Sequence, residues 1–149
     1  MCAEASRDDL WSVLACPECQ GTLERGGESL RCPRGHAFPI VRGIPRFVAT
    51  DAYVDSFSFE WNTHKTTQLD SHRGDTSSEE IFRQKTGLTP ADLRGKLVLD
   101  AGVGSGRFSE IMARWGARVV GIDLSYAVEA AQENFRALPN VLIAQADIA

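Results

Sequence analysis

The sequence contains no long apolar run, and this absence excludes a membrane-spanning helix. None of its hydrophobic stretches approaches the roughly 18 to 20 residues that are needed to cross a bilayer. Residues 1–9 show no apolar core behind a basic start, so we expect no secretory signal. The sequence therefore predicts a cytoplasmic protein that does not associate with a membrane.

The chain also lacks a strong excess of charge of either sign. It has 16 basic and 20 acidic side chains among 149 residues, which gives a formal net charge of −4. A charge this small creates no global attraction to nucleic acid. There is no internal repeat and no low-complexity segment. The composition, with 43% hydrophobic and 24% charged residues, is that of a globular protein and excludes disordered and fibrous classes.

Cysteine is scarce, and three of the four cysteines stand in a metal-binding pattern. Two residues separate Cys16 from Cys19, and three separate Cys32 from His36. Thiolates at this spacing, completed by a second pair with a histidine, supply four ligands to one tetrahedral ion. A reducing compartment favours metal over a disulfide. We predict a structural Zn²⁺ site with no open position for water or substrate; the alternative is a ribbon without metal, with His36 as a packing or surface residue. Cys2 fits neither pair and is predicted to be a free thiol.

Glycine is concentrated in one loop, which follows a short apolar run. Residues 97–99 predict a buried strand, and the apolar spacing after the loop predicts a helix. The glycines Gly102, Gly104 and Gly106 let backbone N–H groups, which we expect to be unpaired, approach a ligand closely. A dinucleotide fingerprint would need a small residue at the position of Arg107, so the pattern argues against NAD.

Two aspartates stand where neighbouring strands are predicted to end. Asp100 follows the first apolar run, and Asp123 follows the next one, residues 119–122. In βαβ nucleotide sites an acidic residue at the second strand accepts hydrogen bonds from ribose hydroxyls. Together with the loop, these positions predict a nucleotide-like ligand. The alternative is that each aspartate is a helix N-cap or a solvated strand end, and that each glycine only forms a tight turn.

Three segments resemble motifs of the class I S-adenosylmethionine-dependent methyltransferases, in the same order along the chain. Residues 98–106 resemble the first motif, residues 121–125 the acidic second-strand motif, and residues 144–148 the third-strand motif. The resemblance implies that the cofactor is S-adenosyl-L-methionine.

The same resemblance implies a role for each matching residue. The three loop glycines would pass under the methionine part of the cofactor, with Asp100 near its amino group. Asp123 would hold the ribose. Asp147 would meet the adenine amino group, with the backbone of Ile148 nearby. The implied cofactor-binding residues are Asp100, Gly102, Gly104, Gly106, Asp123, Asp147 and Ile148.

A second resemblance concerns the cysteine-containing part. Residues 14–19 through 38–45 resemble a small zinc-ribbon family that includes activators of tRNA and protein methyltransferases, and the ribbon fused ahead of many bacterial methyltransferases. The connector segment 56–61 extends the resemblance to those fused proteins. The metal ligands implied are the residues of the spacing pattern, Cys16, Cys19, Cys32 and His36.

The sequence divides into three parts: a zinc ribbon over residues 1–48, a connector with helices over 49–92, and the N-terminal half of an S-adenosylmethionine-binding Rossmann-like domain over 93–149. The predicted fold class is α/β, a small β-rich zinc ribbon followed by the first three strands of a Rossmann-like methyltransferase sheet. In the connector, Ser77 and Thr89 are predicted to be the N-caps of two helices, the first ending at Gly87.

The methyltransferase resemblance implies a seven-stranded sheet, of which this chain supplies three strands. We therefore expect a fragment of a longer enzyme, with catalytic residues that are unknown and would lie beyond Ala149. The strand at residues 97–100 would then expose an edge. We expect the 149-residue form to be marginally folded or to self-associate, and to show no methyl transfer.

The predicted function is transfer of a methyl group from S-adenosylmethionine to an unidentified acceptor, either a small molecule or RNA. Two alternatives stay open, a non-catalytic zinc-ribbon module that binds a partner and an RNA-directed methyltransferase. The RNA alternative depends on four arginines that could also form a solvated edge. These are Arg31, Arg34, Arg42 and Arg46. His64, Lys65 and His72 are candidate substrate contacts or solvated loop residues.

Overall fold

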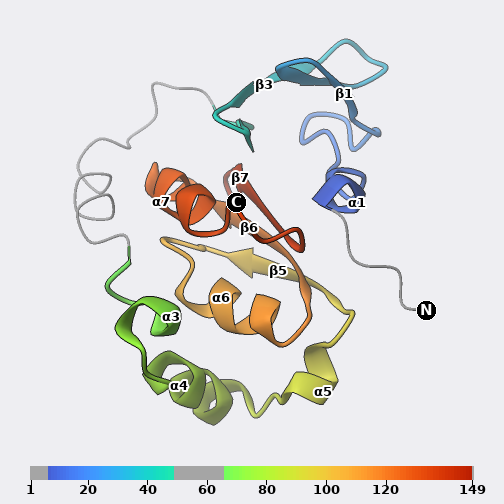
Figure 1. Cartoon of the computed structure of the whole chain (residues 1–149). Coiled ribbons are helices and arrows are strands. Elements are labelled where there is room, and N and C mark those ends of the chain that lie inside the picture. Colours follow the sequence, from blue (N-terminus) through green and yellow to red (C-terminus); the bar gives the residue numbers. More distant parts are fainter. Residues whose placement is uncertain (1–6, 49–65, 149) are drawn as a thin grey trace.

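The structure is a computed structural model that describes residues 7–48 and 66–148. Two sheets dominate it, an antiparallel one formed by the N-terminal part and a parallel one formed by the C-terminal part (Figure 1). This confirms the predicted α/β class. Cys2, His64, Lys65 and the aromatic segment 56–61 lie outside the described residues. Among the described helices, none is long and apolar enough to cross a membrane.

The N-terminal part, called the ribbon below, is a short helix followed by four antiparallel strands. Each strand pairs with the next along the chain, in the order β1-β2-β3-β4. Hairpin connections of this kind need only tight turns, which the glycines between the strands allow. The elements are α1 (Arg7–Trp11), β1 (Glu24–Gly26), β2 (Ser29–Arg31), β3 (Ala37–Val41) and β4 (Ile44–Pro45).

The C-terminal part is a parallel sheet with the order β5-β6-β7, joined by two helical crossovers. Both crossover helices lie on the same face of this sheet (Figure 1), as right-handed βαβ connections require. The strands are β5 (Leu97–Ala101), β6 (Arg118–Asp123) and β7 (Val141–Gln145), and the crossover helices are α6 (Arg107–Arg114) and α7 (Ala127–Asn134). The predicted β-α-β-α-β order is therefore confirmed.

The main core lies between the parallel sheet and these two helices. Ile111, Val119 and Ile143 have no exposed surface, and together they fill the space between α6, β6 and β7. The near-continuous apolar runs of β6 and β7 fit this arrangement, because both faces of these strands are covered.

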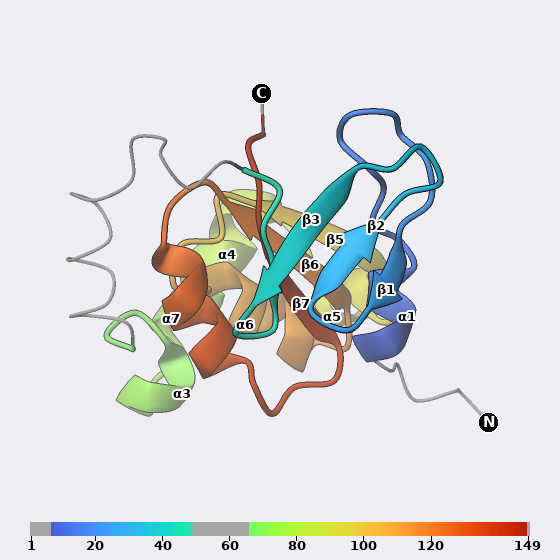
Figure 2. The ribbon, with the colours of Figure 1, turned by 90° about the horizontal axis from the view of Figure 1, so that it is seen from above.

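The ribbon covers the opposite face of the sheet. Leu10 and Leu30 of the ribbon pack in one cluster with Val120 of β6 and Leu142 of β7. Figure 2 shows the ribbon strands lying over the parallel sheet. The ribbon and the parallel sheet therefore share a hydrophobic cluster, and this cluster contributes to the stability of both parts.

The two edges of the parallel sheet differ. At the β7 edge, the chain after β4 forms a parallel bridge between Arg46 and Gln145, and the Phe47 N–H donates to the Gln145 carbonyl at 2.8 Å. At the β5 edge, Leu97 and Leu99 are 49% and 61% exposed. The predicted strand is confirmed, and among the described residues its outer edge is unpaired, as predicted. The prediction that its side chains are buried is wrong for Leu97 and Leu99, because the ribbon covers β6 and β7 and stops short of β5.

Three short helices form the described part of the connector, and the first two of them lie against α6. They are α3 (Asp70–Arg73), α4 (Ser77–Thr86) and α5 (Pro90–Leu93). Thr89 is the N-cap of α5, as predicted, and its N–H donates to the Asp92 carboxylate at 2.8 Å. Gly87 ends α4 in a left-handed conformation, also as predicted. The prediction that Ser77 is the N-cap of α4 is wrong, because the N-cap is Thr76 and the first turn of α4 donates to a carboxylate of α3.

Candidate functional site

The metal-ligating residues predicted from the cysteine spacing come together in the ribbon. The donor atoms of Cys16, Cys19, Cys32 and His36 all lie within 4.8 Å of one another. The Sγ atoms of Cys19 and Cys32 are 3.7 Å apart, and His36 Nδ1 lies 3.5 Å from the Cys16 Sγ and 3.3 Å from the Cys32 Sγ. The sulfurs come from the segment after α1 and from the turn between β2 and β3.

These separations fit one tetrahedral zinc ion. With bonds of about 2.3 Å to sulfur and about 2.1 Å to nitrogen, tetrahedral geometry places two sulfurs about 3.8 Å apart and a sulfur and a nitrogen about 3.6 Å apart. Four protein donors would fill all positions of such an ion. The chemistry of this donor set is therefore that of a closed structural site rather than a catalytic one.

The surroundings of Cys32 favour the form of the thiol that binds metal. Burial acts to raise the pKa of this thiol, but hydrogen bonds from the backbone of His36 and Arg34 and from the side chains of Cys19 and His36 outweigh it. The pKa of Cys32 falls to about 6. Thiolate is the ligand that zinc requires, so the site is prepared for metal near neutral pH.

The glycine loop lies between the end of β5 and the start of α6, and much of its backbone is already paired. The N–H groups of Gly102 and Val103 donate to the Ile122 carbonyl at 2.8 and 2.9 Å. The Gly104 N–H donates to the Asp123 carboxylate at 2.9 Å. The expectation of unpaired loop N–H groups is therefore wrong for these three residues, because the loop folds back onto the end of β6.

The glycines of the loop serve different purposes. Gly102 and Gly106 have φ angles of +84° and +100°, in the left-handed region that side chains disfavour. A Cβ atom on Gly102 would meet nothing within 4 Å, so its backbone faces open space. A Cβ atom on Gly106 would lie 2.2 Å from the Phe135 ring. Gly102 thus leaves room at the surface, whereas Gly106 allows α6 to approach the end of α7.

Asp123 occupies the predicted position at the end of β6 and is half-buried. One carboxylate oxygen accepts from the N–H and the hydroxyl of Ser125, at 2.9 and 2.7 Å, and the other accepts from the Gly104 N–H. A carboxylate offers about four lone-pair sites. Three are used within the chain, which leaves room for one further donor.

Asp100 lies at the same end of the neighbouring strand. Its carboxylate accepts from the Ser109 hydroxyl of α6 at 2.6 Å. Burial raises the pKa of Asp100, the Ser109 hydrogen bonds oppose that rise, and the nearby Asp123 carboxylate adds to it. Two carboxylates therefore share the carboxyl end of the sheet, and a cation bound between them would relieve their repulsion.

The third predicted group lies after β7. Asp147 and Ile148 are both exposed, the latter by 70%. Asp147 also lines a groove of about 450 Å³, whose other walls include Val13 and Leu14 of the ribbon and Leu99 of β5. This groove is mainly apolar and lies on the ribbon face of the sheet, apart from the glycine loop.

The four arginines considered for RNA binding do not form one free surface. Arg46 is 6% exposed and pairs with Glu129 of α7 and with the Gln145 side chain. Arg42 is exposed and pairs with the same glutamate at 3.4 Å. Arg46 therefore joins the ribbon to α7. His72, another candidate contact, is exposed on α3.

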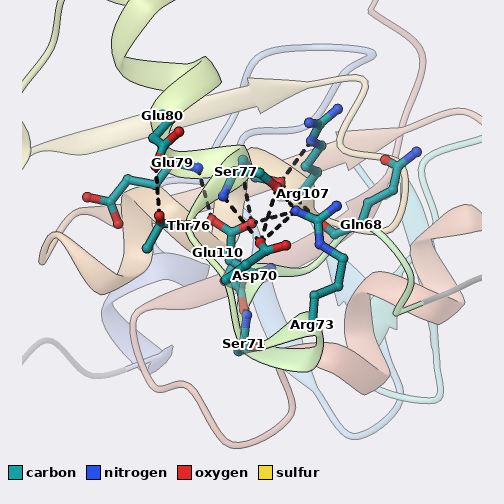
Figure 3. Close-up of polar contacts among 12 residues, drawn as sticks. Gln68, Asp70, Ser71, Arg73, Thr76, Ser77, Glu79, Glu80, Arg107 and Glu110 are labelled. Atoms are coloured by element: carbon teal, nitrogen blue, oxygen red, sulfur yellow. Dashed lines mark hydrogen bonds and ion pairs between the residues drawn. The ribbon is translucent and has the colours of Figure 1, made fainter.

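A buried polar network that the sequence did not reveal fixes the connector helices on α6 (Figure 3). Glu110 of α6 accepts from the Asp70 N–H at 2.8 Å and from the Ser71 N–H at 3.3 Å. Asp70 in turn accepts from the N–H groups of Ser78 and Glu79, both at 2.9 Å. Glu110 thus binds the N-terminus of α3, and Asp70 binds the N-terminus of α4. Negative charge is favoured at both places by the helix dipole.

One signal could have pointed to this network. Glu110 stands directly before Ile111 and Met112 on the buried side of α6, and a carboxylate in such a place requires partners. Those partners are 40 positions away along the chain. Local patterns therefore could have marked Glu110 but not Asp70.

Comparisons with known proteins agree with this geometry. Residues 98–149 match the family model described as methyltransferase domain, and residues 7–43 match the one described as Trm112p-like protein. The chain thus carries a segment similar to Trm112p-like proteins, followed by a segment similar to methyltransferase domains, in the order that the sequence predicts. The first model covers the parallel sheet with its glycine loop, and the second covers α1 and the predicted metal ligands. Among curated proteins, none matches this chain.

Two solved structures are similar to parts of the chain. One is phosphoethanolamine N-methyltransferase 1 of Haemonchus contortus, in complex with phosphoethanolamine and S-adenosylhomocysteine, with 24% identity over 62% of this chain and 21% of that chain and a TM-score of 0.42. The other is magnesium protoporphyrin IX methyltransferase of Synechocystis PCC 6803 with bound S-adenosylhomocysteine, with 27% identity over 65% of this chain and 42% of that chain and a TM-score of 0.33. The chain thus spans less than half the length of either protein.

Proposed function

We propose that the carboxyl end of the parallel sheet binds S-adenosyl-L-methionine and that the chain is part of a methyltransferase. The observation that carries the proposal is the juxtaposition of Asp100 and Asp123 beside a glycine loop that is open at Gly102. The match of residues 98–149 to a methyltransferase domain supports the same assignment.

The residues that would hold the cofactor are those named from the sequence. Asp100 offers a carboxylate to the amino group of the methionine part, and Asp123 keeps one acceptor position for a ribose hydroxyl. Holding both hydroxyls on Asp123 would require one of the chain's own donors, such as the Ser125 hydroxyl, to give way. Asp147 and Ile148 are proposed for the adenine. The bound cofactor would supply an electrophilic methyl group to an acceptor nucleophile.

We further propose that the ribbon binds one Zn²⁺ through Cys16, Cys19, Cys32 and His36 and that this ion is structural. The geometry leaves no open coordination position. The Trm112p-like match suggests a partner-binding role for the ribbon. Within this chain, the surface that the ribbon engages is the face of β6 and β7, which its apolar residues cover.

Calorimetric titration with S-adenosylmethionine and S-adenosylhomocysteine tests the cofactor proposal. Both should bind, and NAD should not compete. Asp123→Ala should weaken binding by about 10- to 150-fold, the effect of losing hydrogen bonds to a charged group. Ser125→Ala is the matched control, because it removes one donor to Asp123 but keeps the carboxylate, and it should retain most of the affinity. Equal affinities in the parent and Asp123→Ala would remove Asp123 from the site, and absence of binding in the parent would overturn the proposal.

A further inference from the structure

Ser109 contacts the proposed site from a buried position behind Asp100. It lies in the first turns of α6, has no exposed surface, and donates its hydroxyl proton to Asp100 at 2.6 Å. The bond spans the glycine loop and joins the start of α6 to the end of β5. A hydroxyl at this depth needs a partner, and the carboxylate is the one that it has.

The structure also explains why this hydroxyl reaches Asp100. A serine inside a helix commonly bonds back to the carbonyl four residues earlier, which here belongs to Ser105. That carbonyl already accepts from the Asn134 side chain of α7 at 2.9 Å. The Ser109 hydroxyl instead crosses to the neighbouring strand and supplies a charge-assisted hydrogen bond.

The charges around Asp100 make this bond important. Asp123 faces it from β6, and burial and this second carboxylate both disfavour its ionised form. On α6, the charged neighbours of Ser109 are engaged elsewhere: Arg107 donates to the Ser78 hydroxyl, and Glu110 accepts from the start of α3. Among the described residues no salt bridge reaches Asp100. Ser109 thus supplies the hydrogen bonds that favour the Asp100 carboxylate, and the contribution of its hydroxyl is larger than that of its backbone.

We propose that Ser109 is a positioning residue that keeps Asp100 ionised and aimed at the cationic amino group of the ligand, an inference that rests on the proposed function. Binding of a cation requires the Asp100 carboxylate, so affinity should fall as the pH drops through the pKa of Asp100. Removal of the Ser109 hydroxyl leaves only the weaker Ser109 backbone hydrogen bond to oppose burial and the Asp123 charge, which both raise the pKa of Asp100. The loss of affinity should then begin at a higher pH.

A direct test follows the Asp100 carboxyl carbon by NMR in the ligand-free chain as the pH is varied. Ser109→Ala should move the Asp100 midpoint upward by about one pH unit, the effect of one hydrogen bond to a charged group. Ser109→Thr keeps the hydroxyl and should restore the parent midpoint. Ser105→Ala is the matched control, since the Ser105 hydroxyl is equally buried but has no hydrogen-bond partner within the described part of the chain. It should leave the midpoint unchanged.

The second arm measures binding of S-adenosylhomocysteine by calorimetry across the same pH range. Below the parent midpoint Ser109→Ala should bind about tenfold more weakly than the parent, and the two should converge at higher pH. An unchanged Asp100 midpoint in Ser109→Ala, or an equal shift in Ser105→Ala, would overturn the role of Ser109 while leaving cofactor binding standing. A parent chain that binds no ligand would overturn the proposed function and the cation-binding half of this inference, whereas the NMR titration would still decide the effect of Ser109 on Asp100.

Discussion

The metal cluster and the carboxyl end of the parallel sheet differ in what their polar groups do when no ligand is bound. The four donors of the cluster point at one another, and three of them are thiols that would repel as thiolates. At the sheet end, Asp100 and Asp123 are held by Ser109, Gly104 and Ser125 of the chain itself. We therefore expect the ribbon to depend on a bound ion, whereas we expect the sheet end to be ordered without its ligand.

The largest effect that this comparison predicts is that of zinc removal. Chelation, or Cys19→Ser, should abolish the order of the ribbon, because binding of a structural ion is part of the folding free energy. The parallel sheet should keep its strands but expose Val120 and Leu142, which the ribbon covers. Elemental analysis of the purified chain and amide NMR spectra with and without chelator measure both effects.

Cys2→Ser is the control, because Cys2 stands outside the pattern of four, and it should retain one zinc per chain. Metal content well under half an equivalent in the untagged parent would contradict the zinc assignment. A ribbon that stays folded in chelator would contradict its dependence on the ion.

The next largest effect concerns the packing of the glycine loop against the end of α7. Gly106→Ala should lower the free energy of unfolding by about 3 kcal/mol, because the new methyl group would overlap the Phe135 ring and its backbone is left-handed. Gly102→Ala introduces backbone strain alone and should cost about 1 kcal/mol, but it should reduce cofactor affinity more than its stability loss explains. Urea unfolding and calorimetry of the two variants give the comparison. Equal stability losses would show that the contact of α6 with α7 is looser than described.

The contact between the ribbon and α7 provides a matched pair of arginines. Arg46→Ala should lower the free energy of unfolding by about 2 kcal/mol, because Arg46 is buried and its loss leaves the Gln145 side chain and Glu129 without their guanidinium. Arg42 pairs with the same glutamate, but its side chain is 78% exposed. Arg42→Ala should therefore change the free energy of unfolding by less than about 0.5 kcal/mol. Urea unfolding measures both. Similar losses in the two variants would mean that the burial of Arg46 does not increase its contribution to the free energy of unfolding.

A smaller effect concerns the buried network and its pH dependence. Burial acts to raise the pKa of Asp70, but hydrogen bonds from Ser78, Glu79 and Arg73 outweigh it and lower the pKa to about 2, below the ordinary value of 3.8. Because the pKa of Asp70 is lower in the folded chain than in the unfolded chain, its carboxylate contributes stability at pH values above the unfolded pKa. This contribution is lost as the pH falls from about 4 to about 2.

Asp70→Asn should therefore destabilise the chain by about 1 kcal/mol at neutral pH and flatten the acid limb of its stability curve. Asp75→Asn, at an exposed position nearby, should leave that limb as it is in the parent. Thermal melts between pH 2 and pH 7 make the measurement. An acid limb of unchanged slope in Asp70→Asn would show that another group controls it.

The sequence predicted the parts whose determinants are local. Cysteine spacing defined the metal cluster, and the glycine loop between apolar runs defined β5, α6 and β6. What it missed depends on partners that only the fold brings together. Arg46 resembles a surface arginine until Glu129 and Gln145 lie beside it, and the cap of α4 comes from Asp70 rather than from the adjacent Ser77.

The most direct test of the account is a titration of the zinc-loaded chain with S-adenosylhomocysteine, followed residue by residue in amide NMR spectra. The account predicts that the largest shifts fall on Gly102, Gly104 and Asp123, at the carboxyl end of the sheet, and that the amides of Cys16 and Cys32 stay in place. Shifts centred on the ribbon or on the apolar groove beside Leu99, with the glycine loop unchanged, would contradict it.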